Sequence, residues 1–349
     1  MIVKDESHII LECLQSIYKY VDYWVICDTG SSDNTPEIIT TFFKEKEIPG
    51  ELLHHTWKNF GHNRTLALQS CRGKGDYIWM IDADDMVVGD FQFPDAMSHD
   101  SYLLRFGTGF SWWRKQIFKA ELDWKYVGVL HEYPYSPQAR TESQIPGEYH
   151  INARTQGGRS LGISEREKYL RDAQILEQGL IEEPENERYV FYLAQSYRDA
   201  GESQKAVEWY QKRFDMGKWA EEAYYALYQK AVILKSLNDP SWLKTALKAY
   251  WYRPTRLESL YEVIKEFRES GDFKMGYELG KLALSQIEKI TTDVLFVHRD
   301  IHIWKFWDEF SLCAYYVGDK KLFKECLETI LERTPPEGKH RILQNLSFV

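Results

Sequence analysis

Three carboxylates stand close together directly after a short apolar segment. Residues 77–81 are typical of a buried strand, and Asp82-Ala83-Asp84-Asp85 follows them. Carboxylates crowded at a strand end repel one another unless a cation or hydrogen-bond donors compensate. Hard divalent cations such as Mg²⁺ and Mn²⁺ choose oxygen ligands and bridge phosphate groups. The cluster therefore indicates a metal site for a diphosphate, with an acidic surface turn as the plainer alternative for this motif by itself.

A second polar stretch follows the apolar run of residues 23–27. It reads Asp28-Thr29-Gly30-Ser31-Ser32-Asp33-Asn34-Thr35, and Pro36 suits the first turn of a helix after it. Small residues let backbone amides approach a ligand, and a helix N-terminus favours anions. A carboxylate at Asp28 can accept a hydrogen bond from a base or a ribose. The stretch is a candidate nucleotide-binding loop, and a simple helix-capping loop is the alternative.

The order of strand and helix signals brings these two stretches to the same edge of a sheet. Apolar runs alternate with helical patterns over the first ~135 residues. The expected strands are 1–3, 23–27, 51–56 and 77–81, and the expected helices are 9–20, 36–46 and 61–70. This alternation predicts a mostly parallel sheet, whose ligands bind beyond the carboxyl ends of the strands, where Asp28 and Asp82 fall. Residues 101–135 are expected to add two or three strands.

The character of the chain changes near residue 164, where strand signals give way to long amphipathic helices. Residues 184–211 are similar to a tetratricopeptide hairpin, with Leu193, Ala194, Tyr197, Ala206 and Tyr210 at its packing positions. Turns are expected at residues 201–202, 238–240, 271–272 and 318–319, a spacing of helical hairpin repeats. The aromatic side chains are expected to pack helix against helix, and a partner-binding groove would be an addition.

The overall composition narrows the functional classes. The chain has 349 residues, of which 44% are hydrophobic and 28% charged, enough to form a core in each of two domains. A net charge of -9 argues against nucleic-acid binding. Its five cysteines form no CxxC pair, so neither a zinc site nor a disulfide framework is indicated. Neither a signal peptide nor a membrane-spanning apolar run is recognisable, and we expect a cytoplasmic protein.

Four motifs in a fixed order resemble the family 2 glycosyltransferases of GT-A fold. They are Ile2-Val3-Lys4-Asp5-Glu6, Val25-Ile26-Cys27-Asp28 with the polar stretch after it, Asn59-Phe60-Gly61-His62-Asn63-Arg64 and Ile81-Asp82-Ala83-Asp84-Asp85. One branch of that family also carries Trp-x-Tyr-x-Gly-x-x-His-Glu, present here from Trp124 to Glu132. Helical tetratricopeptide-like tails occur in the same branch, including among enzymes that glycosylate peptide cysteines. The family usually has Asn where this chain has Asp5.

The resemblance implies a fold and a division into domains. Residues 1–160 would form an α/β GT-A domain, Rossmann-like with a mostly parallel sheet. Residues 161–349 would form an all-α domain of tetratricopeptide-like repeats.

The resemblance also implies roles for individual residues. The nucleotide-sugar donor would be contacted by Val3, Glu6, Asp28, Gly30, Ser32, Arg64, Asp82 and Ala83. Mn²⁺ or Mg²⁺ would be bound by Asp84 and Asp82, with His131 completing the shell. Glu132 would be the general base, with Asp123 as the alternative, and Asp85 would touch the sugar or brace the turn. Arg114 is a further candidate for the diphosphate, and Trp112, Trp113 and Trp124 could stack on sugar or pack in the core.

The predicted function is inverting, metal-dependent transfer of a sugar, as in hexosyltransferases, from a UDP-sugar to an acceptor. The acceptor is left open between a peptide or protein and a glycan. The helical tail could recruit it, form a homodimer or support the catalytic domain. Two other functions remain as alternatives: a non-catalytic repeat scaffold with a degenerate transferase domain, and a nucleotidyltransferase, which would share the metal carboxylates.

Overall fold

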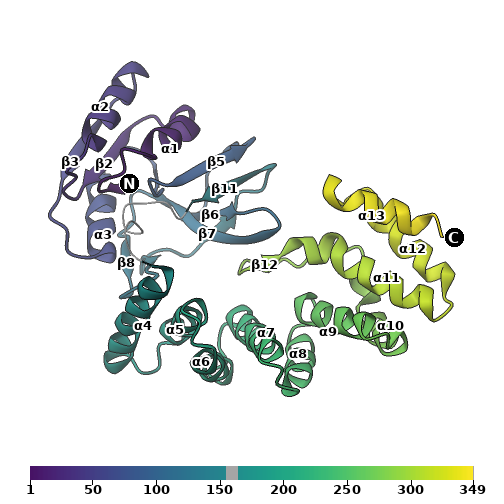
Figure 1. The fold of residues 1–349 in the computed structure, drawn as a ribbon. Helices are drawn as coiled ribbons and strands as arrows, with labels where there is room; N and C mark the ends of the chain where they lie inside the picture. Colours follow the sequence, from purple (N-terminus) through teal and green to yellow (C-terminus); the bar gives the residue numbers. More distant parts are fainter. Residues whose placement is uncertain (155–163, 349) are drawn as a thin grey trace. The chain divides into compact units, whose positions relative to one another are not determined.

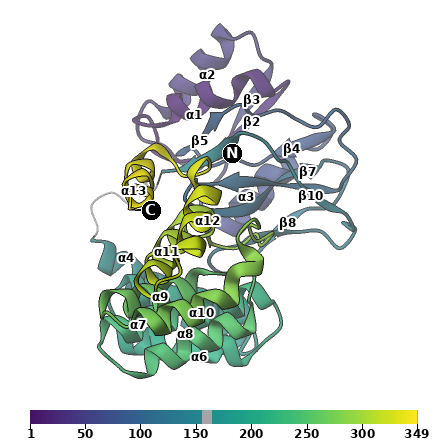
Figure 2. The same ribbon diagram turned by 90° about the vertical axis from the view of Figure 1, so that its right-hand side faces the viewer.

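The computed structural model describes residues 1–154 and 164–348 (Figures 1 and 2). The chain forms two compact units, Met1–Thr108 with Trp112–Pro184, and Gly109–Ser111 with Glu185–Val349. The predicted boundary at residues 160 and 161 lies outside the described residues. None of the described helices has the length and apolar character that crossing a membrane requires.

The first unit begins with three parallel strands and the helices that connect them (Figure 1). The strands are β1 (Ile2–Val3), β2 (Trp24–Asp28) and β3 (Gly50–His54), and the helices are α1 (Ile10–Ile17), α2 (Thr35–Glu45) and α3 (Phe60–Ser70). A 3₁₀ turn (Tyr18–Tyr20) extends α1. The sequence pattern predicted each of these elements, although α3 has no clear apolar period and buries Asn63 together with Ala67 and Leu68.

Strand β2 is buried along its whole length, and its alternate side chains enter two different cores. Trp24 and Ile26 join one apolar cluster, and Val25 and Cys27 join another. Successive side chains of a strand point to opposite faces, so both faces of β2 are fixed by packing. This packing places Asp28, the last residue of β2, at a defined point of the sheet edge.

The second sheet of the first unit has mixed strand directions. It contains β4 (Tyr77–Trp79), β5 (Asp85–Gly89), β6 (Ser101–Phe106), β7 (Phe110–Lys119), β10 (Glu142–Gln144) and β11 (Tyr149–Ala153). Strand β4 pairs with β7 in antiparallel direction, as do β6 with β7 and β11 with β5. Parallel pairing joins β10 and β11 to β6. The parallel arrangement expected after β3 is therefore only partly present, because the short β6–β7 connection allows no crossover and forces a hairpin.

A small ribbon completes the strands of the first unit, and a helix follows its sheets. Strands β8 (Lys125–Val127) and β9 (Tyr133–Tyr135) form an antiparallel pair. Helix α4 (Glu165–Glu182) begins at a capping box, in which the side chains of Ser164 and Glu167 each accept from the other's backbone amide.

The second unit is built from helical hairpins. Its helices are α5 (Glu187–Asp199), α6 (Ser203–Asp215), α7 (Ala220–Ser236), α8 (Ser241–Tyr252), α9 (Glu258–Glu269), α10 (Phe273–Gly280), α11 (Phe306–Tyr316), α12 (Lys320–Leu331) and α13 (Pro336–Leu346). The 3₁₀ segment η3 (Lys281–Gln286), the short strand β12 (Val297–His298) and the π-helical segment η4 (Ile301–Lys305) lie between α10 and α11.

The tetratricopeptide-like pattern of the second unit agrees with its packing. All five residues expected at packing positions are buried: Leu193, Ala194, Tyr197, Ala206 and Tyr210. The four expected turns separate helices, and Gly201 and Gly271 adopt the left-handed backbone (φ +79° and +81°) that ends a helix most easily at glycine.

Candidate functional site

The acidic turn Asp82-Ala83-Asp84-Asp85 connects β4 to β5, and its backbone is held from several sides. The amide of Asp85 donates to the carbonyl of Asp82 at 3.1 Å. The thiol of Cys13, on α1, donates to the same carbonyl at 3.4 Å. Arg154 Nε donates to the carbonyl of Asp84 at 3.0 Å. The turn is thus tied to α1 and to the end of β11 through its main chain.

Arg64 joins the acidic turn to the His-Glu pair. Its Nη2 donates to Asp82 Oδ1 at 2.5 Å, and its Nη1 donates to Glu132 Oε1 at 2.5 Å. The Arg64 side chain is 12% exposed and that of Glu132 is 5% exposed. The guanidinium also lies over the rings of Phe60 and Tyr126, with centroids at 5.6 and 5.7 Å. Asp82 and Glu132, which lie 18 and 68 positions after Arg64 in the sequence, therefore share its guanidinium as a partner.

The motif around Arg64 explains how that side chain is positioned. Asn59 caps α3 by accepting from the amide of His62 at 2.8 Å. The fully buried Asn63 accepts from the amide of Lys58 at 2.9 Å and donates to the carbonyl of Thr56 at 3.1 Å. Both asparagines therefore fix the start of α3, from which Arg64 extends.

The loop that carries His131 and Glu132 has an unusual backbone. Gly128 and His131 both lie at positive φ, +116° and +51°. The φ of Gly128 is one that side-chain-bearing residues rarely adopt, so glycine there allows the turn that leads to Glu132. The His131 side chain is exposed, whereas Glu132 turns inward to Arg64.

Arg114, on β7, supplies a second positive charge to the turn. Its Nη1 donates to Asp82 Oδ2 at 3.2 Å. Burial alone would raise the pKa of Asp82, but the charges of Arg64 and then Arg114 outweigh it and hold that pKa below its ordinary range. Burial, and then the negative charges of Asp82 and Asp84, raise the pKa of Asp85 to about 7. The two arginines thus neutralise Asp82, while Asp85 remains in a negative potential.

The polar stretch after β2 forms its own hydrogen-bond network around Asp28. The buried Asp28 carboxylate accepts from the amide of Ser31 at 3.1 Å and from its hydroxyl at 2.5 Å. The amide of Gly30 donates to the same carboxylate at 3.4 Å, and His54 Nδ1 lies 3.3 Å from it. The carbonyl of Val3 accepts from the amide of Thr29 at 2.9 Å. Asp28 therefore shapes the loop directly.

Contacts between residues 5–7 and 31–35 lock the first two motifs together. Asp5 has a left-handed backbone (φ +56°), and its carboxylate accepts from the amide of Ser32 at 2.7 Å and from its hydroxyl at 3.0 Å. Asp and Asn tolerate that conformation better than most residues, so Asp5 can stand where the family usually has Asn. The amide of Glu6 donates to the hydroxyl of Thr35 at 2.8 Å. Val3, Glu6, Asp28, Gly30 and Ser32 therefore belong to one built region.

The remaining candidates divide into those near the acidic turn and those elsewhere. Asp123 is 61% exposed and pairs with Arg72, which lies just beyond the C-terminal end of α3, whereas Arg64 lies in its first half. Asp123 therefore pairs with a different arginine from the one that contacts Glu132 and Asp82. Trp124 is buried and packs on Phe118, so it is a core residue.

The metal-ligand set stays a prediction. Within residues 1–154 and 164–348, no group of three or more His, Cys, Asp or Glu side chains is arranged to hold a metal ion. Asp82, Asp84 and His131 do not form such a group, and Asp82 instead has two arginine partners.

Sequence reasoning missed two residues that support the site. Arg154 binds the carbonyl of Asp84 and also pairs with Glu12 of α1. Tyr126 is buried beside Arg64, and burial raises the pKa of its hydroxyl to about 12. Tyr126 belongs to the quoted Trp-x-Tyr motif, which was a usable signal. Arg154 follows β11, a strand that the pattern did not predict, and no sequence signal marked it.

Taken together, the structure has an α/β unit with an acidic strand-end turn and a following set of helical hairpins. Residues 1–137 match the family model described as glycosyl transferase family 2. A TPR repeat-containing protein of Synechococcus elongatus is 24% identical over 82% of this chain and 74% of that protein. The SPbeta prophage-derived glycosyltransferase SunS of Bacillus subtilis is 23% identical over 61% of this chain, and the match covers 51%, about half, of its length.

Solved structures also resemble part of the chain. One described as MamA protein is 15% identical with a TM-score of 0.36, over 50% of this chain and 87% of that chain. YrrB, described as a TPR protein with an unusual peptide-binding site, is 11% identical with a TM-score of 0.36, over 52% and 85%. The sequence relatives confirm the two resemblances predicted from the motifs, a family 2 glycosyltransferase region and a tetratricopeptide-like region.

Proposed function

We propose that this protein is an inverting glycosyltransferase that moves a sugar from a UDP-sugar to an acceptor. One observation carries the proposal: Arg64 binds both Asp82 of the acidic turn and Glu132 of the His-Glu pair. Three of the motifs shared with family 2 glycosyltransferases therefore meet at one guanidinium. This arrangement would place the donor sugar and the general base next to each other, as a single-step displacement at the sugar requires.

In this proposal the carboxylates of the acidic turn bind a divalent cation, which requires them to rearrange from the positions described above. Arg64 and Arg114 both pair with Asp82, and burial, followed by the charges of the neighbouring carboxylates, raises the pKa of Asp85 to about 7. Oxygen ligands of this kind suit Mn²⁺ or Mg²⁺, and Asp84 with Asp82 would hold the ion. When bound, the ion would neutralise charge on the departing diphosphate.

The residues of the site have distinct tasks in this proposal. The acceptor atom forms a bond to the anomeric carbon while the bond from that carbon to the diphosphate breaks, and UDP leaves with the bonding electrons. Glu132 takes the acceptor proton, and Arg64 holds Glu132 in place. Arg114 adds positive charge near the diphosphate. The loop around Asp28 receives the nucleoside.

The acceptor in this proposal is a peptide or protein that the helical hairpins recruit. The proposal combines a region similar to a glycosyltransferase with a region similar to a TPR repeat-containing protein. Repeat surfaces of this type commonly bind extended segments of partners. If the acceptor is instead a glycan, variants with an altered helical surface should transfer sugar to it as fast as wild type does.

The test measures UDP release with UDP-glucose, UDP-galactose or UDP-GlcNAc in the presence of Mn²⁺. We expect release with at least one donor, and loss of at least 100-fold in Asp84→Asn, a size typical for a lost charge-stabilising group. Asp95→Asn, an exposed carboxylate away from the turn, is the matched control and should keep activity. Release of pyrophosphate would instead indicate a nucleotidyltransferase. Absence of metal-dependent UDP binding in calorimetry would leave the scaffold as the explanation.

A further inference from the structure

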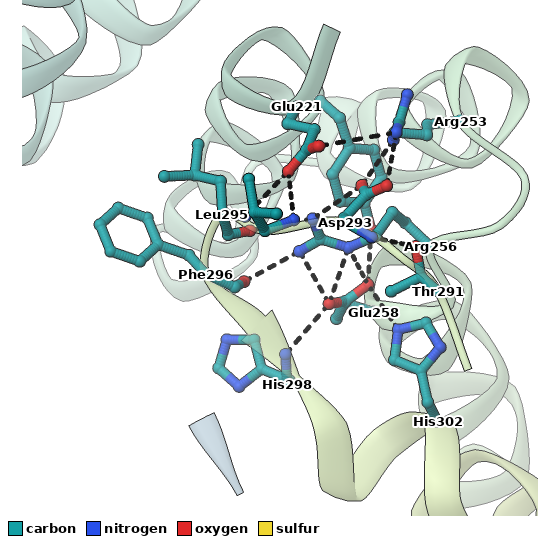
Figure 3. Close-up of polar contacts among 12 residues, drawn as sticks. Glu221, Arg253, Arg256, Glu258, Thr291, Asp293, Leu295, Phe296, His298 and His302 are labelled. Carbon is teal, nitrogen blue, oxygen red and sulfur yellow. Dashed lines mark hydrogen bonds and ion pairs between the residues drawn. The ribbon is translucent and has the colours of Figure 1, made fainter. Parts of the chain in front are cut away.

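An irregular segment of the second unit is held in one shape by buried charges. Residues 293–300, here called the strap, lie between η3 and η4 and include β12. Arg256 is fully buried and donates to the carbonyls of Leu295 and Phe296 at 3.1 and 2.9 Å (Figure 3). Charged side chains therefore satisfy backbone hydrogen-bonding groups of the strap that regular secondary structure would otherwise satisfy.

Carboxylates bind the amides of the same segment. Glu221 accepts from the amides of Val294 and Leu295, both at 2.8 Å, and Glu258 accepts from the amide of His298 at 3.2 Å (Figure 3). Glu258 is fully buried and is paired with Arg256. Burying charges is costly unless partners satisfy them, and here Arg256 and Glu258 satisfy each other together with backbone groups of the strap. The strap is thus built to keep a definite shape.

The strap contacts the start of β7 through the Phe296 side chain and through the backbone of Val297 and His298. Phe296 lies at φ +48°, a conformation that costs about 1–3 kcal/mol for a non-glycine residue. Its ring stacks on Phe110 and Phe191, with centroids at 5.7 and 6.2 Å. The next two residues, Val297 and His298, pair antiparallel with Ser111 and Phe110. The strained backbone at Phe296 is therefore compensated by contacts with residues 110 and 111.

Gly109, next to Phe110 and Ser111, lies close to Asp300 at the end of the strap. The amide of Asp300 donates to the carbonyl of Gly109 at 3.4 Å. A Cβ at Gly109 would meet Asp300 Oδ2 at 2.5 Å and Cγ at 2.8 Å, so a larger residue there would displace the Asp300 carboxylate. All these contacts lie within the second unit, because Gly109–Ser111 belongs to it.

From Ser111 the strand β7 runs without a break to Arg114, which contacts Asp82. We infer that the strap is a positioning device for β7, fixing residues 109–111 so that Arg114 keeps its place at the acidic turn. This inference rests on the proposed function for its effect on the donor. Pairing with β6 also holds residues 112–115, so the strap refines the position of Arg114 and does not create it.

The experiment uses a clash and its relief in the full chain. Gly109→Ala should push Asp300 away and loosen the start of β7, and Gly109→Ala with Asp300→Ala removes the carboxylate that causes the clash. Amide hydrogen exchange of residues 110–114 should rise about tenfold in the single variant and return to within twofold of wild type in the double variant. The KM for the donor should rise about fivefold in the single variant, with kcat within twofold, and should recover likewise.

A second variant loosens the strap without touching residues 109–111. Glu221→Gln weakens the bonds to Val294 and Leu295 and should raise donor KM and exchange at 110–114 in the same direction. Glu187→Gln, which breaks an exposed pair with Lys218 in the same unit, is the matched control and should change neither. Combined with Arg114→Lys, Gly109→Ala should add less than its separate effect, because both act on one contact.

The outcomes separate the inference from the proposed function. Unchanged exchange at 110–114 in Gly109→Ala and Glu221→Gln would overturn the inference, as would raised exchange with an unchanged donor KM. If wild type acts on no nucleotide sugar, the proposed function fails. The exchange data would then still decide whether the strap holds β7 as far as Arg114.

Discussion

The contact of Arg64 with two carboxylates leads to a quantitative prediction for stability. Arg64→Met leaves Glu132, 5% exposed, without its cationic partner, whereas Asp82 keeps Arg114. Breaking a buried ion pair from one side costs roughly 3–5 kcal/mol. Because Arg64 is 12% exposed and Asp82 keeps a partner, we expect a loss near the lower end, about 3 kcal/mol. For a unit of this size, the loss corresponds to a Tm lower by about 6–12 °C.

A double-mutant cycle tests whether the loss arises from the unpaired carboxylate. Glu132→Gln alone should cost about 1 kcal/mol, because Arg64 keeps Asp82. The double variant Arg64→Met/Glu132→Gln should cost less than the sum of the two by about 2 kcal/mol. Thermal and urea unfolding followed by circular dichroism give these values.

The matched control is a surface ion pair near the end of the same helix. Arg72 and Asp123 are 54% and 61% exposed, so Arg72→Met should lower the Tm by less than about 2 °C. A Tm of Arg64→Met within this range, or additive effects in the cycle, would show that Arg64 does not neutralise Glu132 as described.

Three further predictions concern other parts of the chain. Burial raises the pKa of Asp308 to about 6, so the folded state keeps this proton as pH rises above 4. The free energy of unfolding, relative to that of Asp308→Asn, should therefore fall by about 2–3 kcal/mol between pH 4 and 7. Urea unfolding of both proteins at the two pH values measures this, and the same difference at pH 4 and pH 7 would contradict it. Asn63→Ala should cost about 2–3 kcal/mol in urea unfolding, because it leaves a buried amide and a carbonyl unsatisfied, and Asn152→Ala, at an exposed position, should cost less. Gly280→Ala should lower stability by about 1–3 kcal/mol, since its Cβ would overlap the Phe310 ring, and adding Phe310→Leu should recover part of the loss.

The sequence predicted the elements with strong local signals. Helix α2 has a proline in its first turn, and three of the four expected hairpin turns have glycine where a left-handed backbone is needed. Strand order led to the expectation that Asp28 and Asp82 lie beyond the carboxyl ends of strands, whereas the role expected for Arg64 came from the family resemblance.

Other features depended on contacts between distant residues. Strand β4 pairs antiparallel with β7, and the sequence of residues 77–79 does not indicate whether that pairing is parallel or antiparallel. Strand β5 begins at Asp85, inside the acidic turn, so its polar start concealed the strand. The contact between Arg64 and Glu132 spans 68 positions and follows from the packing of α3 against β8. Residue types suggested roles, but the pairing of charges required the three-dimensional arrangement.

The assignment of Gly109–Ser111 to the helical unit has a consequence for how this architecture can be recombined. The chain passes from one unit to the other after Thr108, after Ser111 and after Pro184, not once. A chimera spliced at a single junction near residue 184 would pair one parent's tripeptide with another parent's helices. Exchange of helical tails among related chains should therefore succeed only when this tripeptide is inherited together with the tail.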